Sequence, residues 1–449
     1  MKKILILGAG LSATSLIDYL IAKSEFFDWQ IKLGDIDIKL AERKIGQHKN
    51  AKAFQFDINE TDKIASALDG NDLVISMLPA RFHDILFAEC LKQGINMATA
   101  SYVSPYLNQI EEEVKAKGLT FLNELGVDPG IDHMSAMQII DRIRAKGGEV
   151  TSFISFTGGL IAPESDDNPW RYKFTWNPRN VVLAGQGVSQ FIFKGRYKYI
   201  PYHKLFERVM SRNVLDFGDF EVYPNRDSLK YRKIYELDEI QTMYRGTLRR
   251  KGFGEAWNVF VQLGCTDDSY TIENSENLTY RSFINTFLKY DIIKPVEEKL
   301  CEYLKIDPNG EVMKKLIWLG IFDEKPIYLK NATPAQILQK ILEEKLGLNA
   351  NDKDMIVMQH EFEYELDQKR YKITSAMGFI GEDTIRTAMA VTVGTPLAIA
   401  VKLFLTGKLS SKGVIIPTKP ELYLPILTEL EEYGIRFIEK EELIPDLKV

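Results

Sequence analysis

The first 130 residues alternate short apolar runs with helical stretches, and this pattern constrains the fold more than any other feature of the chain. Runs of strand length occupy residues 3–7, 30–33, 53–56, 73–78, 96–100 and 119–122. Stretches with helical spacing separate most of them; in residues 13–23, for example, apolar side chains recur on one face. Strands that alternate with helices at this pace predict βαβ units and a parallel sheet, which is an α/β fold.

The turn after the first predicted strand has the sequence Gly8-Ala9-Gly10-Leu11-Ser12-Ala13. It follows a strand and opens a helix, which is the context that a dinucleotide-binding fingerprint requires. Gly8 would make the tight turn, Gly10 would let the backbone approach a pyrophosphate, and Ala13 would allow close packing of helix on strand. The unpaired N–H groups at the helix start would face the phosphates. A strand–turn–helix without a ligand is the alternative, but the context favours a Rossmann-type dinucleotide domain.

Asp35 lies at the end of the second predicted strand. An acidic residue at this place can accept hydrogen bonds from both ribose hydroxyls and would repel a 2′-phosphate. We therefore expect NAD as the cofactor, with NADP as the alternative.

The pattern changes after residue 130, where aromatic residues become dense. Residues 181–183 have a strand-like pattern, residues 275–347 are mainly helical in pattern, and residues 355–362 and 370–375 resemble strands again. Small-residue helix and strand patterns return from residue 384. We infer three domains, some of which are discontinuous.

Two apolar segments bear on the location of the protein. Residues 389–405 form the most apolar stretch, but Gly394, Pro396 and Lys402 interrupt it, so a buried helix is expected rather than a membrane span. The apolar run at the N-terminus stops at Gly8 and is too short for a signal peptide. We therefore expect a cytoplasmic protein without a membrane partner.

Charge and composition exclude several other classes. A net charge of -6 argues against a nucleic-acid partner. The three cysteines are far apart in the sequence and predict neither a disulfide framework nor a zinc site. The five histidines lack metal-ligand spacing, so no metal is expected.

Two segments of the first domain carry candidate site residues. Residues 123–133 follow its last strand and would face the crevice at the carboxyl ends of the strands, with Asp128 held extended by the following proline. Asp132 could instead cap the next helix, and for His133 a site role and a packing role stay open. Ser101 and Tyr102 supply hydroxyls at another strand end, where they could bind a carboxylate or a ribose or simply form a turn.

Arginine-rich segments occur at residues 170–176, 223–228 and 245–250, interleaved with aromatic residues. The planar fork of arginine matches carboxylates, so these segments would suit a substrate with several carboxylates. A solvated basic face is the alternative for each segment taken singly.

Taken together, these segments resemble the saccharopine dehydrogenases of the L-glutamate-forming type, also called saccharopine reductases. The resemblance spans nearly the whole chain and rests on Gly8-Ala9-Gly10, Ala100-Ser101-Tyr102, residues 124–133, residues 158–164, Asp167-Asn168-Pro169, residues 172–176, 223–228 and 245–249, and residues 390–400. One departure is Phe156-Thr157 before Gly158-Gly159, where relatives often carry Tyr-Cys. A thiol at that place is therefore not expected to be needed here.

The resemblance implies a fold of three domains. They are a Rossmann domain of residues 1–130 and 385–449, an α/β mixed-sheet domain of residues 131–270 and 355–384 that binds substrate and pairs subunits in a homodimer, and a small helical domain of residues 271–354. It also implies site residues. Substrate contacts would fall on Ser101, Tyr102, Asp128, Lys173, Arg226, Thr247, Leu248 and Arg249. Dinucleotide contacts would fall on Leu11, Ser12, Asp35, Asp57, Ile58, Leu78 and Val127, beside Gly8, Gly10 and Ala13.

The reaction that the resemblance implies is the reversible oxidation of saccharopine to L-glutamate and 2-aminoadipate 6-semialdehyde, a step of lysine metabolism. Hydride would leave the carbon beside the amine nitrogen, and water would hydrolyse the resulting imine. Asp128 and Tyr102 are the candidates for proton transfer, and Arg226, Arg249 and Lys173 for binding carboxylates. Two alternatives stay open: a carboxynorspermidine synthase-like enzyme, and a dinucleotide-binding scaffold without catalysis.

Overall fold

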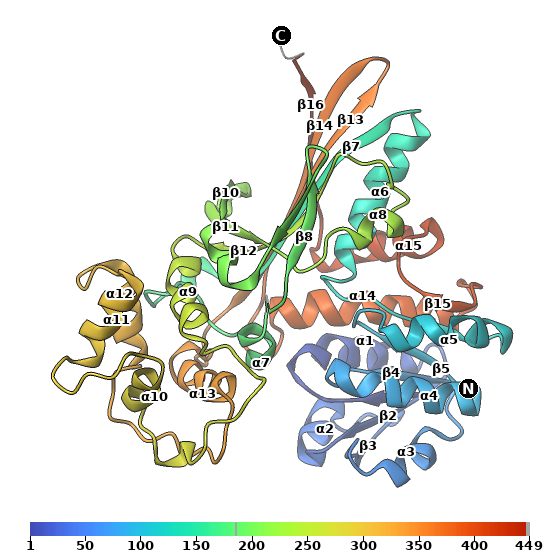
Figure 1. Ribbon diagram of the computed structural model, residues 1–449. Coiled ribbons are helices and arrows are strands. Elements are labelled where there is room, and N and C mark those ends of the chain that lie inside the picture. The colour runs from blue at the N-terminus through green and yellow to red at the C-terminus, as the bar shows by residue number, and fades with distance from the viewer. Residues whose placement is uncertain (185, 446–449) are drawn as a thin grey trace. The chain divides into compact units, whose positions relative to one another are not determined.

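The computed structural model describes residues 1–184 and 186–445, and the chain divides into two compact units (Figure 1). The first unit comprises Met1–Glu149 and Phe379–Ile438, and the second comprises Val150–Gly378 and Glu439–Val449. This division differs from the expected one at both ends. Residues 131–149 stay with the dinucleotide domain, and the chain returns to the second unit at its end.

The first unit is built on a seven-stranded sheet with the order β15-β6-β5-β4-β1-β2-β3. Its strands are β1 (Lys2–Leu7), β2 (Trp29–Asp35), β3 (Ala51–Gln55), β4 (Leu73–Ser76), β5 (Asn96–Thr99), β6 (Thr120–Leu122) and β15 (Gly413–Ile415). Every pair of neighbours is parallel. The order reverses between β1 and β4, which is the doubly wound Rossmann arrangement, so the predicted α/β fold of this unit is confirmed.

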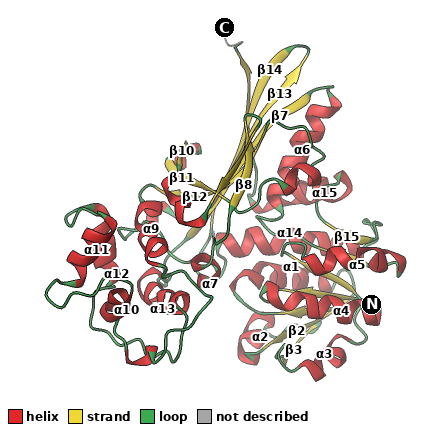
Figure 2. Cartoon of the chain, viewed as in Figure 1, coloured by secondary structure: helices red, strands yellow, loops and turns green. Residues whose placement is uncertain are grey.

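Several helices of the first unit lie beside this sheet (Figure 2). The helices of this unit are α1 (Thr14–Ser24), α2 (Ile38–Ile45), α3 (Thr61–Leu68), α4 (His83–Gln93), α5 (Pro105–Ala116), α6 (Ile131–Ala145), α14 (Ala388–Leu405) and α15 (Pro420–Leu430), with 3-10 turns η1 (Leu11–Ala13), η2 (Ala80–Phe82) and η7 (Glu431–Tyr433). Helix α15, in contrast, packs on α14 and α6. α14 is long and apolar enough to cross a membrane, but 78% of it is buried in the structure. It packs on α1 so closely that a Cβ at Gly394 would lie 2.7 Å from the backbone nitrogen of Leu16.

The second unit is built on a nine-stranded sheet. Seven strands follow the order β10-β11-β12-β7-β13-β14-β16, and β8 pairs with both β12 and β9. Its strands are β7 (Glu149–Ile161), β8 (Ser189–Phe193), β9 (Arg196–Ile200), β10 (Met210–Asn213), β11 (Asp219–Pro224), β12 (Thr242–Arg250), β13 (Asp354–Leu366), β14 (Lys369–Ile380) and β16 (Ile438–Ile444). β12 pairs antiparallel with β11 and parallel with β7, so the sheet is mixed, as predicted.

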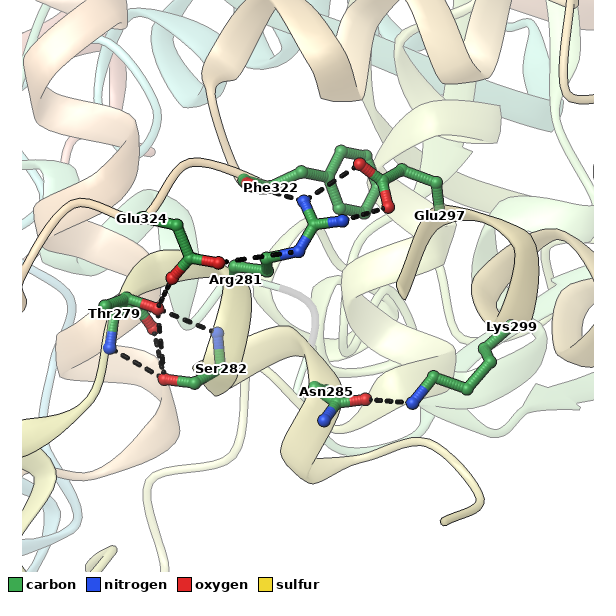
Figure 3. A network of polar contacts seen from close by, with 8 residues as sticks. All are labelled: Thr279, Arg281, Ser282, Asn285, Glu297, Lys299, Phe322 and Glu324. Atoms are coloured by element: carbon green, nitrogen blue, oxygen red, sulfur yellow. Dashed lines mark hydrogen bonds and ion pairs between the residues drawn. The ribbon is translucent and has the colours of Figure 1, made fainter. Parts of the chain in front are cut away.

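The second unit also holds the predicted helical segment. Its helices are α7 (Pro178–Val182), α8 (Lys230–Ile234), α9 (Phe253–Leu263), α10 (Tyr280–Thr286), α11 (Val296–Leu304), α12 (Glu311–Leu319) and α13 (Pro334–Leu346), with 3-10 turns η3 (Pro163–Ser165), η4 (Tyr202–Glu207), η5 (Leu215–Phe217) and η6 (Ser275–Asn277). A capping box between Thr279 and Ser282 starts α10. Arg281 then binds both carboxylate oxygens of Glu297, at 2.9 and 2.6 Å, and ties α10 to α11 (Figure 3).

Residues 181–183, expected to be strand-like, instead form the end of α7. The Asn177 side chain accepts a hydrogen bond from the backbone N–H of Arg179 at 2.9 Å, and Pro178 occupies the first helical position. These two helix-start signals outweigh the strand preference of the β-branched residues that follow.

Candidate dinucleotide and substrate sites

The glycine loop after β1 has the shape that a pyrophosphate needs. Gly8 has a φ of +100°, and a Cβ there would lie 3.0 Å from the backbone carbon of Met77, so only glycine fits this turn. A Cβ at Gly10, in contrast, would meet no atom of the described chain within 4 Å. Open space therefore lies beside Gly10, where η1 and then α1 begin. The loop fits a bound dinucleotide phosphate.

Asp35 lies beside this loop, as the sequence predicted. Its Oδ2 accepts the backbone N–H of Ala9 at 2.6 Å, and its Oδ1 accepts that of Asp37 at 2.9 Å. The carboxylate is thus fixed at the carboxyl end of β2, where ribose hydroxyls would reach it.

Lys44 is a residue that sequence reasoning missed. It projects from α2, and its Nζ donates to the carbonyl of Gly10 at 2.9 Å and to the hydroxyl of Thr14. Burial lowers the pKa of Lys44 to about 8, although the carboxylates of Asp18 and Asp35 oppose this shift. Lys44 therefore brings a titratable cation to the glycine loop.

The other predicted dinucleotide residues lie at or near the carboxyl ends of the strands. Asp57 and Ile58 follow β3, Leu78 follows β4, and Val127 lies in the loop after β6. Asp57 accepts hydrogen bonds from the backbone and side chain of Asn59, at 2.9 and 2.8 Å. Leu11 is 53% exposed in the first turn after Gly10, next to Ser12.

Tyr102 and Asp128, predicted from separate segments, lie together in the structure. The Tyr102 hydroxyl donates to Oδ1 of Asp128 at 3.0 Å, across 26 positions of sequence. The carbonyl of the neighbouring Ser101 accepts the backbone N–H of Glu124 at 3.0 Å, which joins the two segments. The Asp128–Pro129 bond is cis.

A buried side-chain contact between Glu124 and His133 lies next to the Asp128 loop in the sequence. Glu124 and His133 are 3% and 0% exposed, and Oε2 of Glu124 lies 2.6 Å from Nε2 of His133. Glu124 also accepts the backbone N–H of Val103 at 3.0 Å, while Asp132 accepts that of Gly130 at 2.6 Å. Asp132 and His133, whose roles the sequence left open, therefore fix the loop that carries Asp128.

In the second unit, Arg249 on β12 is 4% exposed and enclosed by aromatic rings. Its Cζ lies 5.1 Å from the ring centroid of Tyr172, 6.0 Å from that of Tyr223 and 5.4 Å from that of Phe253. Nη1 donates to the carbonyl of Leu248 at 2.9 Å, whereas Nε has no hydrogen-bond partner in the described part of the chain. A buried guanidinium with an unpaired N–H can bind an anionic group.

Thr247, Leu248 and Arg226, the other substrate candidates of this unit, differ in the groups that they could present to a ligand. The Thr247 hydroxyl donates to Oδ1 of Asn225 at 2.6 Å, and successive side chains alternate, so Thr247 shares a face of β12 with Arg249. Leu248 points to the other face and is fully buried, which leaves only its backbone for a ligand. Arg226 is exposed, with Nη2 3.4 Å from the carbonyl of Leu183.

The Lys173 ammonium already forms ion pairs with carboxylates of the protein. It is 2% exposed, and its Nζ pairs with Oδ1 of Asp167 at 2.8 Å and with Oδ2 of Asp352 at 2.7 Å. Burial opposes the charged form, but these two carboxylates more than compensate and raise the pKa of Lys173. The predicted carboxylate clamp therefore has two internal carboxylates as partners.

Comparisons with known proteins match the whole chain to one family. The model of the saccharopine dehydrogenase NADP binding domain matches residues 4–122, and that of the saccharopine dehydrogenase C-terminal domain matches residues 126–435. Two fungal proteins are named saccharopine dehydrogenase [NADP(+), L-glutamate-forming]. The one from Schizosaccharomyces pombe is 32% identical, with 99% of this chain and 100% of that protein aligned. The one from Saccharomyces cerevisiae is 33% identical, with 98% and 99% aligned.

A solved structure agrees with this match. The apo saccharopine dehydrogenase (L-Glu forming) from Saccharomyces cerevisiae has a TM-score of 0.87, a sequence identity of 31%, and 98% and 100% coverage of the two chains. The expected nicotinamide dinucleotide class is confirmed, although both fungal relatives are named for NADP. The chain belongs to the saccharopine dehydrogenase family.

Proposed function

We propose that the protein is an L-glutamate-forming saccharopine dehydrogenase. It would oxidise saccharopine, with water and a nicotinamide dinucleotide, to L-glutamate and 2-aminoadipate 6-semialdehyde. The family match supports the reaction, and Arg249 carries the substrate assignment. Arg249 is 4% exposed and keeps an unpaired Nε in the described chain, which supports an anionic ligand for it.

Saccharopine fits these residues because it is a secondary amine with three carboxylates. Arg249 would bind one carboxylate in its aromatic enclosure, and the exposed Arg226 would bind another. Thr247, beside Arg249 on the same face of β12, would add a hydroxyl contact. Lys173 would contribute by holding its segment in place through Asp352.

The protonated amine of saccharopine must lose its proton before oxidation. Asp128 would attract the ammonium and accept the proton, directly or through water, while its hydrogen bond to Tyr102 holds the carboxylate in place. The nicotinamide, when bound, accepts the hydride from the carbon beside the nitrogen. Water then adds to the substrate imine, and the carbinolamine breaks its C–N bond to release the amine of glutamate and the aldehyde.

We propose NAD as the preferred dinucleotide. Asp35, fixed by the backbone N–H groups of Ala9 and Asp37, would accept ribose hydroxyls and repel a 2′-phosphate. This preference would distinguish the protein from its fungal relatives, which are named for NADP. A cytoplasmic homodimer that acts in lysine metabolism completes the proposal and rests on the family resemblance.

A steady-state assay of the purified full chain tests this function. Saccharopine with NAD or NADP should give the reduced cofactor, followed by its absorbance, together with L-glutamate. Arg249→Met should raise the KM for saccharopine and leave dinucleotide binding unchanged. Dinucleotide binding without turnover would indicate a scaffold, and turnover only with a polyamine and an aldehyde would indicate the condensation enzyme.

A further inference from the structure

A second polar group lies unpaired beside Arg249. Tyr172 is 1% exposed, and its ring packs against Phe253 with a centroid distance of 5.1 Å and lies 5.1 Å from the Arg249 guanidinium. Its hydroxyl has no hydrogen-bond partner in residues 1–184 and 186–445. The Nε of Arg249 is likewise buried and unpaired there, so two neighbouring side chains each keep an unpaired donor.

The segment that carries Tyr172 is not loosely held. The Asn168 side chain donates to the carbonyl of Tyr172 at 3.1 Å, and the next residue, Lys173, makes two ion pairs. The backbone N–H of Phe174 donates to the carbonyl of Leu346 at 2.7 Å. A fixed, buried hydroxyl without a partner is destabilising, so proteins rarely retain one unless a ligand or water satisfies it.

We propose that Tyr172 is a further substrate-binding residue, whose hydroxyl donates to the same carboxylate that Arg249 binds. The inference rests on the proposed function. A carboxylate has about four lone-pair sites on its two oxygens, so it can accept from both residues at once. Burial raises the pKa of Tyr172 to about 12, against a smaller opposing effect of Arg249, so the phenol keeps its proton at neutral pH.

Tyr244 provides a matched control. It is 3% exposed, and its hydroxyl is also unpaired among the described residues, but alternation along β12 places it on the face opposite Arg249. Its ring packs on Phe191 with a centroid distance of 4.9 Å. The cation that acts on Tyr244 is Arg212, which is already paired with Glu361 at 2.8 Å. Tyr244→Phe therefore removes an unpaired buried hydroxyl on the face of β12 opposite the proposed Arg249 site.

The test compares Tyr172→Phe and Tyr244→Phe in the full chain. Tyr172→Phe should raise the KM for saccharopine about tenfold or more, because one hydrogen bond to a charged group is lost, and should leave the dinucleotide Kd unchanged. Tyr244→Phe should leave both constants within about twofold of wild type. Neither change should lower Tm appreciably, because neither hydroxyl has a partner in the described protein.

Two outcomes would overturn the role of Tyr172 while wild-type turnover stays intact. One is a folded Tyr172→Phe variant with an unchanged KM, as expected if water satisfies the hydroxyl. The other is a Tyr172→Phe variant that is strongly destabilised or fails to fold, which would show that the hydroxyl pairs within the protein. Absence of saccharopine turnover by the wild-type chain would instead overturn the proposed function, and this inference with it.

Discussion

Replacing Lys173 by methionine separates a structural role from the substrate role that the family resemblance implies. The Lys173 ammonium is 2% exposed and lies between Asp352, whose side chain is 9% exposed, and Asp167, whose side chain is 56% exposed. Methionine keeps the length and apolar character of the stem but removes the charge. The variant therefore leaves the Asp352 carboxylate buried without its cation.

The expected loss of stability follows from the burial of Asp352. Removing one partner of a buried ion pair costs about 3–5 kcal/mol. Asp167 is more than half exposed and can be solvated again, and Asp352 still accepts the backbone N–H of Asn349, so the lower end applies. A loss of about 3 kcal/mol corresponds to a fall in Tm of roughly 6–12 °C for a unit of this size.

Calorimetry and chemical denaturation of Lys173→Met, Asp352→Asn and the double variant would measure this coupling. The double variant should regain much of the lost stability, because no buried charge is then left unpaired. For folded Lys173→Met, the KM for saccharopine should change by less than about threefold. A variant as stable as wild type with a KM raised tenfold or more would refute this reasoning and assign Lys173 to the substrate.

Three further predictions concern the first unit. Wild-type kcat/KM should be higher with NAD than with NADP, and Asp35→Asn, which keeps an acceptor for Ala9, should reduce that ratio about tenfold or more; a wild-type preference for NADP would contradict this. Asp128→Asn should lower kcat/KM by about 10²-fold with little change in Tm, whereas a stable variant of near-normal kcat/KM would remove Asp128 from proton transfer. The kcat/KM for the dinucleotide should fall as pH rises through about 8, where Lys44 loses its charge. The kcat/KM of Lys44→Met should be lower than that of wild type and should not change over this pH range. A wild-type kcat/KM that does not change with pH there would show that the Lys44 charge does not contribute to dinucleotide binding.

The first unit was predictable because its signals are local. Several of its strands, such as β1 and β4, contain buried apolar runs. Only glycine fits at Gly8, in the turn between the first strand and the first helix. The strand that eluded prediction, β15 (Gly413–Ile415), has three residues and joins the sheet only by pairing with β6. A segment that short carries no periodicity of its own.

In the second unit, α7 shows that neighbouring signals must be weighed together. Val181 and Val182 favour a strand when taken alone, but Asn177 and Pro178 form a helix start just before them. The Asn177 side chain caps this helix by accepting the backbone N–H of Arg179. The information was present in the sequence, four residues upstream of the segment that it determines.

Site partners were harder to predict than site residues, because partners are distant in sequence. Asp352 lies 179 positions from Lys173, and Asp128 lies 26 from Tyr102. Tyr102 and Asp128 were both identified, but from separate arguments, and only the fold brings their oxygens to 3.0 Å. Lys44 gave no signal at all, since a lysine on a surface helix normally faces solvent.

Hydrogen-bond satisfaction separates Lys173 and Glu124 from Arg249 and Tyr172, although all four side chains are buried. Lys173 and Glu124 are both buried, but each has partners within the protein at 2.6–2.8 Å. Arg249 is as deeply buried, yet its Nε is open within the described residues, as is the hydroxyl of Tyr172 beside it. A sequence motif does not distinguish a buried residue with partners inside the protein from one without them. Their variants should differ: loss of the Lys173 charge should lower the free energy of unfolding, whereas loss of the Arg249 or Tyr172 donor should raise the KM of the proposed substrate.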